Sequence, residues 1–193
     1  GWEPVVLSCK KPFNWGVPDD AIALNEIPSQ VKVLRTATFE PFNRWWKLKK
    51  TRRATAAAHR KELAMQQAAK ELNGKATMKH FFLDFFNTPD RVQGWIPFAV
   101  WRGLRIMQQE RIDAIFATSP PAGALVTACF LSKLTKKPLV VDYQDPWTTN
   151  NPHRYHFRIM EKINRKLEEI VLHQSRYIIS MSETRKEEMM RCF

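Results

Sequence analysis

The sequence predicts an α/β protein with a Rossmann-like parallel sheet that carries helices on both faces. Two short runs, residues 114–117 and 139–141, are apolar throughout, as expected for central strands that are buried on both faces. A helical run at 120–135 lies between them. Along the rest of the chain, strand-like segments continue to alternate with helix-like segments, which favours parallel pairing through helical crossovers.

The other strands and loops follow from local composition. Apolar or alternating runs predict strands, and clusters of Pro, Asn, Asp and Gly predict loops. The predicted strands are 5–8, 31–35, 112–117, 139–142 and 177–180, the predicted loop is 10–27, the predicted turn is 87–91, and 79–87, with its four Phe residues, is a strand or a partly buried loop.

Helices are predicted where apolar residues recur at spacings of three and four. Pro97 opens one such helix, which runs to Gln109, because Pro is well tolerated in a first turn. Its stripe is Ile96, Val100, Leu104 and Met107, and the stripe of a later helix is Ile159, Ile163, Leu167 and Ile170. Further helices are predicted at 44–72, which Asn73 and Gly74 end, at 120–135 and at 183–190.

The domain is expected to extend over all of residues 1–193, with 44–72 as a basic helical insertion. A chain of 193 residues suffices for one α/β domain with a sizeable core. Gly1 followed by the run at 4–8 resembles a helix end that leads into a strand, so we expect the first strand of the sheet to be missing here. An uncovered strand edge favours self-association, which predicts a homodimer or a larger assembly.

The positive charge favours an anionic partner. The formal net charge is +12, which suits nucleic acid, acidic lipid or a phosphorylated substrate. Eight basic residues and no acidic one lie between Arg44 and Lys61. Trp prefers the membrane interface, and each Lys or Arg near an anionic leaflet contributes about 1 kcal/mol. The predicted membrane-binding residues are Trp45, Trp46, Lys47, Lys49, Lys50, Arg52 and Arg53. The alternatives are a solvated helix with its Trp side chains tucked into the domain, and a nucleic-acid-binding stretch, although no recognised motif accompanies it.

Cysteine usage and hydropathy bear on localisation. Cys9, Cys129 and Cys192 show no paired spacing, which predicts a reducing compartment, without disulfides, and Cys129 is expected to pack as a small hydrophobe. No apolar run approaches the roughly 20 residues that span a bilayer, and no signal peptide is visible. We therefore expect a cytoplasmic protein that is peripheral on the inner face of the membrane.

Several short segments together resemble a known family. They are Gly-Trp-Glu-Pro-Val-Val-Leu at 1–7, Pro-Asp-Arg at 89–91 with Trp95, Ala-Thr-Ser-Pro-Pro at 117–121, Asp-Tyr-Gln-Asp-Pro-Trp at 142–147 and Tyr-Ile-Ile-Ser-Met-Ser at 177–182. They resemble the N-terminal, acceptor-side half of family 4 glycosyltransferases, which have the two-domain GT-B fold. Gln144 stands where Arg is common in that family, so we assign no phosphate contact to that position.

The resemblance implies an activity and a division of labour. Members transfer a sugar from a nucleotide-sugar donor to an acceptor, here a glycan or a lipid-linked acceptor, with retention of configuration and without a metal. A role in building bacterial cell-envelope polysaccharide is the expectation. The family also implies a first strand with a Gly-rich loop before Gly1, and a second Rossmann-like domain after Phe193 that binds most of the donor. The 193-residue chain alone is therefore expected to hold no cofactor and to be inactive.

Small and polar residues follow both central strands, at the edge where open α/β sheets bind ligands. Ser119 suits the N-cap position of the following helix, and the helix end favours an anion. The two prolines that follow leave Ala122 and Gly123 to supply amides, so a phosphate cradle and a capped turn that only shapes the cleft are both open. The residues expected in the acceptor and donor cleft are Thr118, Ser119, Asp142, Gln144, Asp145, Trp147 and His153.

Asp142 and Asp145 are the candidate catalytic residues. A carboxylate there could position a sugar hydroxyl or act as a base, whereas two carboxylates without a third ligand make a poor metal site. Asp145 could instead cap the turn that follows it. Trp147 could stack on a sugar face or seal the edge of the domain. His153 and His156 are each either a catalytic group or an ordinary surface histidine.

Two further features have alternative explanations. Glu161 and Glu169 are separated by seven residues, which resembles the Glu-x7-Glu motif that this superfamily carries in its second domain. Three basic residues share the same predicted helix, so a solvated face explains the pair. For the whole chain, the competing class is a non-catalytic membrane-binding or nucleic-acid-binding module built on the basic segment at 44–61.

Overall fold

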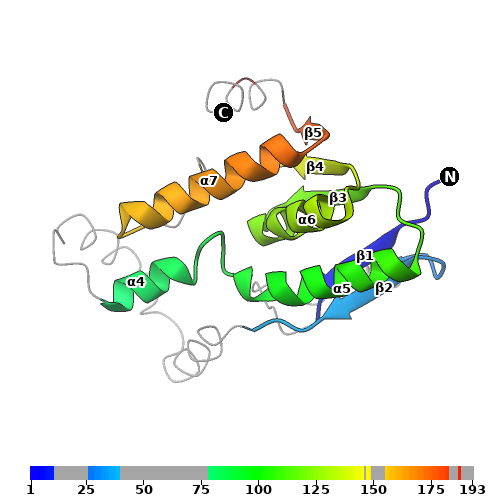
Figure 1. Ribbon diagram of the computed structural model, residues 1–193, viewed down its shortest axis with the longest axis horizontal. Coiled ribbons are helices and arrows are strands. Elements are labelled where there is room, and N and C mark those ends of the chain that lie inside the picture. The colour runs from blue at the N-terminus through cyan, green and yellow to red at the C-terminus, as the bar shows by residue number, and fades with distance from the viewer. Residues whose placement is uncertain (11–25, 40–77, 146, 149–154, 183–186, 188–193) are drawn as a thin grey trace.

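The computed structural model describes residues 1–10, 26–39, 78–145, 147–148, 155–182 and 187. These residues contain five strands and four α-helices, which alternate over residues 96–180 (Figure 1). All strand pairs are parallel. The predicted α/β class with a parallel, Rossmann-like sheet is therefore confirmed.

The strands form two sheets, and each predicted strand is present. β1 (Val5–Cys9) pairs with β2 (Lys32–Thr36). β4 (Leu139–Tyr143) lies between β3 (Ile115–Ser119) and β5 (Tyr177–Ser180). The order β3-β4-β5 follows the chain, as expected when each crossover moves one position along the sheet.

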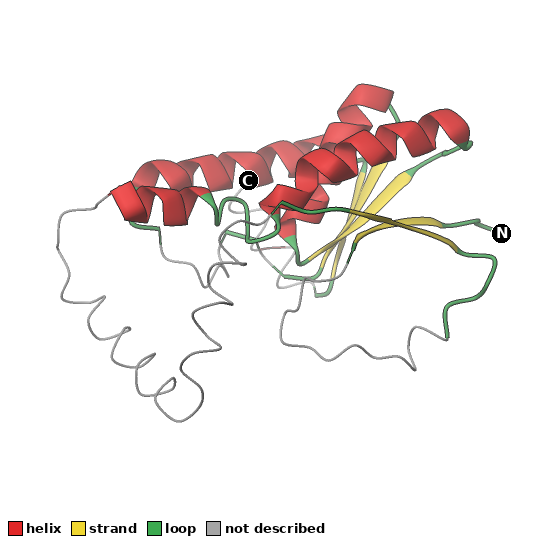
Figure 2. Cartoon of the chain, turned by 90° about the horizontal axis from the view of Figure 1, so that it is seen from below, coloured by secondary structure: helices red, strands yellow, loops and turns green. Residues whose placement is uncertain are grey.

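Three long helices lie on the same face of these strands (Figure 2). They are α5 (Ile96–Gln109), α6 (Ala122–Thr135) and α7 (Arg158–Gln174). On the opposite face, Phe116 of β3 is 63% exposed. The expectation that 114–117 is buried on both faces is thus wrong for β3, which alternates between buried and exposed residues. In the described part of the chain, the long helices cover one face of the sheet, whereas the prediction placed helices on both.

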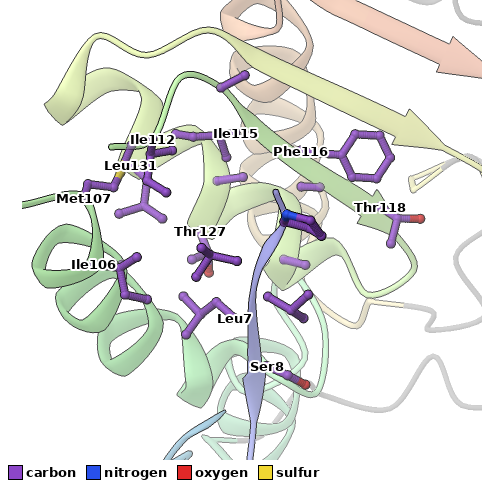
Figure 3. Close-up of a pocket in the computed structure, with 18 of the residues that line it drawn as sticks. Leu7, Ser8, Ile106, Met107, Ile112, Ile115, Phe116, Thr118, Thr127 and Leu131 are labelled. Carbon is purple, nitrogen blue, oxygen red and sulfur yellow. The ribbon is translucent and has the colours of Figure 1, made fainter. Parts of the chain in front are cut away.

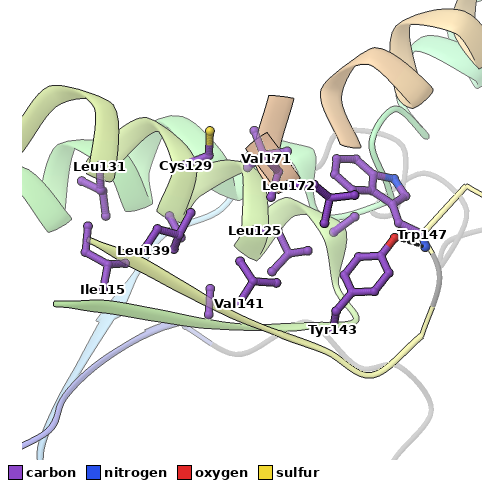
Figure 4. Packing of buried hydrophobic residues seen from close by; sticks show 14 residues of the cluster. Ile115, Leu125, Cys129, Leu131, Leu139, Val141, Tyr143, Trp147, Val171 and Leu172 are labelled. Carbon is purple, nitrogen blue, oxygen red and sulfur yellow. Dashed lines mark hydrogen bonds between the residues drawn. The ribbon is translucent and has the colours of Figure 1, made fainter. Parts of the chain in front are cut away.

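The core lies between β4 and the helices above it (Figure 4). Leu125, Leu139 and Val141 have no exposed surface, and burial of each such side chain contributes about 1.5–3 kcal/mol. The predicted stripe on α5 packs against this core. Cys129 is buried among the same side chains, and this burial raises the pKa of its thiol, so it packs as the small hydrophobe that was predicted.

One expectation about these segments is wrong, and another is confirmed only in part. The Phe-rich segment forms a helix, α4 (Met78–Phe85), because contacts of Phe81 and Asp84 with the start of α7 hold it in that conformation. The predicted striped helix is present as α7, and Leu167 and Ile170 of the stripe pack against the core. Ile159 and Ile163, however, are 54% and 41% exposed. The buried residues of that helix are Met160, Asn164, Glu168, Val171 and Leu172, so its inner face includes polar groups that an apolar stripe does not predict.

The connections agree better with expectation. The predicted turn at 87–91 follows α4, and a short 3-10 helix, η1 (Gln93–Trp95), leads into α5. Trp95 in this turn is buried and donates its ring N–H to Thr36 Oγ1 at 2.7 Å, which ties β2 to the start of α5. The predicted helix at 44–72, the helix at 183–190 apart from residue 187, and nearly all of the loop at 10–27 lie outside the described residues.

A cavity of about 1160 Å³ lies between the two sheets. β1 and β3 face each other across it, and α5 and α6 close it on the helical side (Figure 3). Among the described residues, each of these two strands has a ladder partner on one side only. The lining is mostly apolar and includes Leu7, Ile106, Met107, Ile115 and Leu131.

Candidate functional site

The carboxyl ends of β3 and β4 lie side by side. In the register of the sheet, Thr118 is opposite Asp142 and Ser119 is opposite Tyr143. Thr118 Oγ1 donates to Asp142 Oδ2 at 3.1 Å. Gln144 Nε2 donates to the same oxygen at 2.9 Å. The structure therefore brings three of the predicted cleft residues into one hydrogen-bonded cluster.

This cluster is accessible to a ligand. Thr118 and Gln144 are exposed and Asp142 is half-buried. The two donors fix Asp142 through Oδ2, and neither of them engages Oδ1. A carboxylate held in this way is preorganised to accept a hydrogen bond from a hydroxyl group of a ligand.

The start of α6 is capped by a residue that the sequence argument did not consider. The amide of Gly123 donates to Asp90 Oδ2 at 2.8 Å, and the amide of Val92 donates to Asp90 Oδ1 at 2.8 Å. Ser119 is buried, and Pro121 occupies the N-cap position without a side-chain hydrogen bond. The prediction that Ser119 caps this helix is therefore wrong. Asp90 neutralises the positive helix end and uses the Gly123 amide that a phosphate would need.

Trp147 is anchored inside the domain. Its side chain is buried, and its ring N–H donates to Asn164 Oδ1 at 3.0 Å. Its backbone amide donates to the Tyr143 hydroxyl at 2.8 Å, as Figure 4 shows, and to Glu168 Oε1 at 3.2 Å. Of the two alternatives, sealing the edge of the domain fits this geometry, because a sugar would need an exposed face of the ring.

Glu168, on α7, holds the loop that follows β4 through hydrogen bonds. The carboxylate is 1% exposed and accepts from the backbone amides of Trp147 and Thr148, each at 3.2 Å, and from the Thr148 hydroxyl. Burial raises the pKa of Glu168 to about 7, although the two amide hydrogen bonds act in the opposite direction. The loop next to Asp142 is thus attached to a group that titrates near neutral pH.

A second buried carboxylate organises the start of α7. Asp84 is fully buried, and its Oδ2 accepts from the backbone amides of His156 and Phe157 at 2.7 and 2.9 Å. Its Oδ1 lies 3.0 Å from His156 Nδ1. The His156 ring stacks on that of His80, with centroids 4.3 Å apart. Sequence reasoning missed Asp84, although an acidic residue in a Phe-rich segment is a usable signal.

The remaining predicted residues have varied surroundings. Asp145 is exposed. Glu161 is exposed, and Glu169 accepts from Lys166 Nζ at 2.9 Å, a hydrogen bond that lowers the pKa of Glu169. These contacts agree with a solvated face on α7. Outside the described residues lie His153 and the predicted membrane-binding residues Trp45, Trp46, Lys47, Lys49, Lys50, Arg52 and Arg53.

Two kinds of feature are absent from the described residues. No group of three or more His, Cys, Asp or Glu side chains there is arranged to hold a metal ion. Nor does that part of the chain contain a helix of the length and hydrophobicity required to cross a membrane.

The architecture is that of a Rossmann-like α/β domain with polar residues at the carboxyl ends of its strands, the edge at which open α/β sheets ordinarily bind ligands. Residues 52–193 match the family model of Glycosyltransferase Family 4. The chain therefore belongs to glycosyltransferase family 4, and these residues correspond to the N-terminal domain region of the GT-B fold. Neither the comparison with curated proteins nor the comparison with solved structures gave a significant match.

Proposed function

We propose that this chain is the acceptor-side half of a retaining glycosyltransferase. It holds a glycan or a lipid-linked acceptor while a sugar is transferred from a nucleotide-sugar donor. Membership of family 4 supports glycosyl transfer. The observation that carries the site is the cluster of Thr118, Asp142 and Gln144 at the carboxyl edge of the sheet.

Asp142 is the residue proposed to contact the reacting sugars. Its carboxylate accepts a hydrogen bond from a sugar hydroxyl and can take up a proton as a general base. Thr118 and Gln144 position it through Oδ2. Asp145 and His153 are proposed to line the same cleft, whereas Ser119 and Trp147 support it from inside the domain.

The donor is proposed to contact this half only in part. At the start of α6, the carboxylate of Asp90 already occupies the Gly123 amide, and it would repel a phosphate. Most phosphate contacts are therefore assigned to the second domain that the family implies. It follows that the purified 193-residue chain should show no turnover, and measurable sugar transfer by it would refute this assignment.

The proposed site is tested by comparing Asp142→Asn with Asp113→Asn in the protein made from the complete reading frame. Asp113 precedes β3, at its opposite end, and is exposed. Transfer of label from a panel of nucleotide sugars into a glycan and lipid extract identifies the working substrates. A hydrogen bond to a charged group contributes about 1.5–3 kcal/mol, so Asp142→Asn should lower kcat/KM by about 10- to 100-fold. Equal effects of the two substitutions would contradict the assignment.

The basic segment is proposed to bring the protein to its acceptor. Its composition, with Trp45 and Trp46 beside five basic residues at 47–53, supports reversible contact with an anionic membrane surface. This would make the protein peripheral on the inner face of the cytoplasmic membrane.

We also propose a homodimer, because β1 and β3 each present one strand edge to the cavity between the sheets. A clean monomer by light scattering would contradict the dimer.

A further inference from the structure

One side of α4 is apolar and exposed. Met78, Phe82 and Phe85 are 71%, 45% and 48% exposed, and their spacing of four and three places them on one side of the helix. The side chains that anchor α4 are different ones. Asp84 bonds to the start of α7, and the ring of Phe81 packs edge-on against that of Phe157, with centroids 5.7 Å apart.

The outer side of α5 continues this pattern. Phe98 and Trp101 are 39% and 56% exposed, and Arg105 lies over the Trp101 ring, 4.2 Å from its centroid. The inner side of α5 is locked against α6, since a Cβ on Gly103 would meet Leu131 Cδ1 at 2.6 Å. Phe98 and Trp101 therefore cannot turn into the core.

The charges on these two helices have one sign at the surface. Asp84 is the only acidic residue within α4 and α5, and it is fully buried. Arg102 and Arg105 are the basic residues of α5. A face that only meets water normally mixes both signs of charge, as the outer side of α7 does with Glu161, Lys162, Arg165, Lys166 and Glu169.

We propose that this surface, called here the α4–α5 face (Met78, Phe82, Phe85, Phe98, Trp101, Arg102 and Arg105), docks on an anionic lipid bilayer. Figure 1 shows α4 and α5 following one another along the same edge of the molecule. Aromatic side chains insert at the level of the headgroups, and Arg extends its charge to the lipid phosphates. The charge of the face is complementary to an anionic leaflet. This docking adds a second surface to the membrane contact proposed for the basic segment, and it does not depend on sugar transfer.

The test is co-sedimentation of the 193-residue chain with vesicles of phosphatidylglycerol and phosphatidylcholine, and with vesicles of phosphatidylcholine alone. The probe variant is Phe82→Gln/Trp101→Gln. The matched control is Phe130→Gln/Ile163→Gln, which removes two side chains, 49% and 41% exposed, from α6 and α7. We expect binding to the anionic vesicles, a loss of at least about tenfold in the partition coefficient of the probe variant, and no comparable loss for the control.

Folding and charge are checked in parallel. Thermal unfolding followed by circular dichroism should show unchanged midpoints for both variants, because all four side chains are exposed. If the probe variant does not fold, Arg102→Glu/Arg105→Glu replaces it, with Lys162→Glu/Lys166→Glu as its control. The proposal is overturned if wild-type protein ignores anionic vesicles, if probe and control lose binding equally, or if the probe variant binds like the wild type. A dimer that the probe substitutions dissociate would assign the face to a second copy instead.

Because no sugar is present in this assay, its outcome is separate from that of the transferase assay. Loss of vesicle binding with intact transfer to a water-soluble acceptor would support the docking face and leave the proposed function standing. Vesicle binding by the probe variant that equals that of the wild type would overturn the docking face alone. Unchanged transfer by Asp142→Asn would overturn the proposed site alone.

Discussion

The helices α6 and α7 both begin at the carboxyl edge of the sheet, and both receive a carboxylate from the same short segment. Asp90 accepts from the Gly123 amide at the start of α6. Asp84 accepts from the amides of His156 and Phe157 at the start of α7. Asp84 is fully buried and also lies 3.0 Å from His156 Nδ1, whereas Asp90 is half-buried and also accepts from the Val92 amide.

This comparison shows which part of the sheet edge is occupied by the protein's own carboxylates and which part is accessible to a ligand. A helix start in this position ordinarily offers its amides to an anionic ligand, but here the protein supplies the anions itself. Asp142, at the same edge, caps neither helix, and it is the carboxylate that we propose to contact a ligand. The segment 78–91, which contains α4 and the turn after it, therefore holds the starts of both α6 and α7 through carboxylate hydrogen bonds.

The largest effect is expected for Asp84→Ala. The substitution leaves the amides of His156 and Phe157 without their acceptor. Each hydrogen bond to a charged group contributes about 1.5–3 kcal/mol, so the two together should cost about 3–6 kcal/mol. Urea unfolding should show the corresponding decrease in the free energy of unfolding. The exposed control Asp113→Asn should stay within about 0.5 kcal/mol of the wild type. A loss below that limit for Asp84→Ala would mean that the start of α7 does not depend on this carboxylate.

A smaller loss is expected for Asp90→Ala. Removal of a capping carboxylate costs about 1–2 kcal/mol, and Asp90, unlike Asp84, is already partly exposed to solvent. The same unfolding experiment measures it. If Asp90→Ala proves more destabilising than Asp84→Ala, the ranking of the two caps by burial is incorrect.

The pattern of strands was predictable because each buried run is local in sequence. The capping was not, because Asp90 meets Gly123 across 33 positions of the chain. Ser119 satisfies the local rule for an N-cap, and tertiary structure overrides it. The setting of Trp147 depends in the same way on Asn164 and Glu168, which lie 17 and 21 positions further on. The edge itself was predictable, since parallel pairing places Thr118 beside Asp142.

A pH-dependent effect is expected from Glu168, which is a buried carboxylate like Asp84. Its pKa in the folded protein is raised to about 7, so the folded state binds its proton more tightly than the unfolded state does. The stabilisation is fully present below the ordinary pKa of the group, 4.5, and is lost as the pH rises through about 7. The midpoint of thermal unfolding should fall over this range.

Glu168→Gln isolates this contribution. The amide keeps an acceptor oxygen for the loop and does not titrate, so the fall in the unfolding midpoint between pH 5 and pH 8 (chosen to bracket the pKa of about 7) should become shallower. Glu169→Gln, one position along on the outer surface of α7, is the control and should leave the slope unchanged. Identical slopes for wild type and Glu168→Gln would show that Glu168 is not the titrating group.

The most direct measurement of the central claim is kcat/KM for sugar transfer by Asp142→Asn and Asp90→Ala of the intact protein, taken well below their unfolding midpoints. The account predicts a loss of about 10- to 100-fold for Asp142→Asn with unchanged stability. For Asp90→Ala it predicts lower stability and a kcat/KM within error of the wild type. The opposite pattern, with transfer abolished by Asp90→Ala and unaffected by Asp142→Asn, would contradict it.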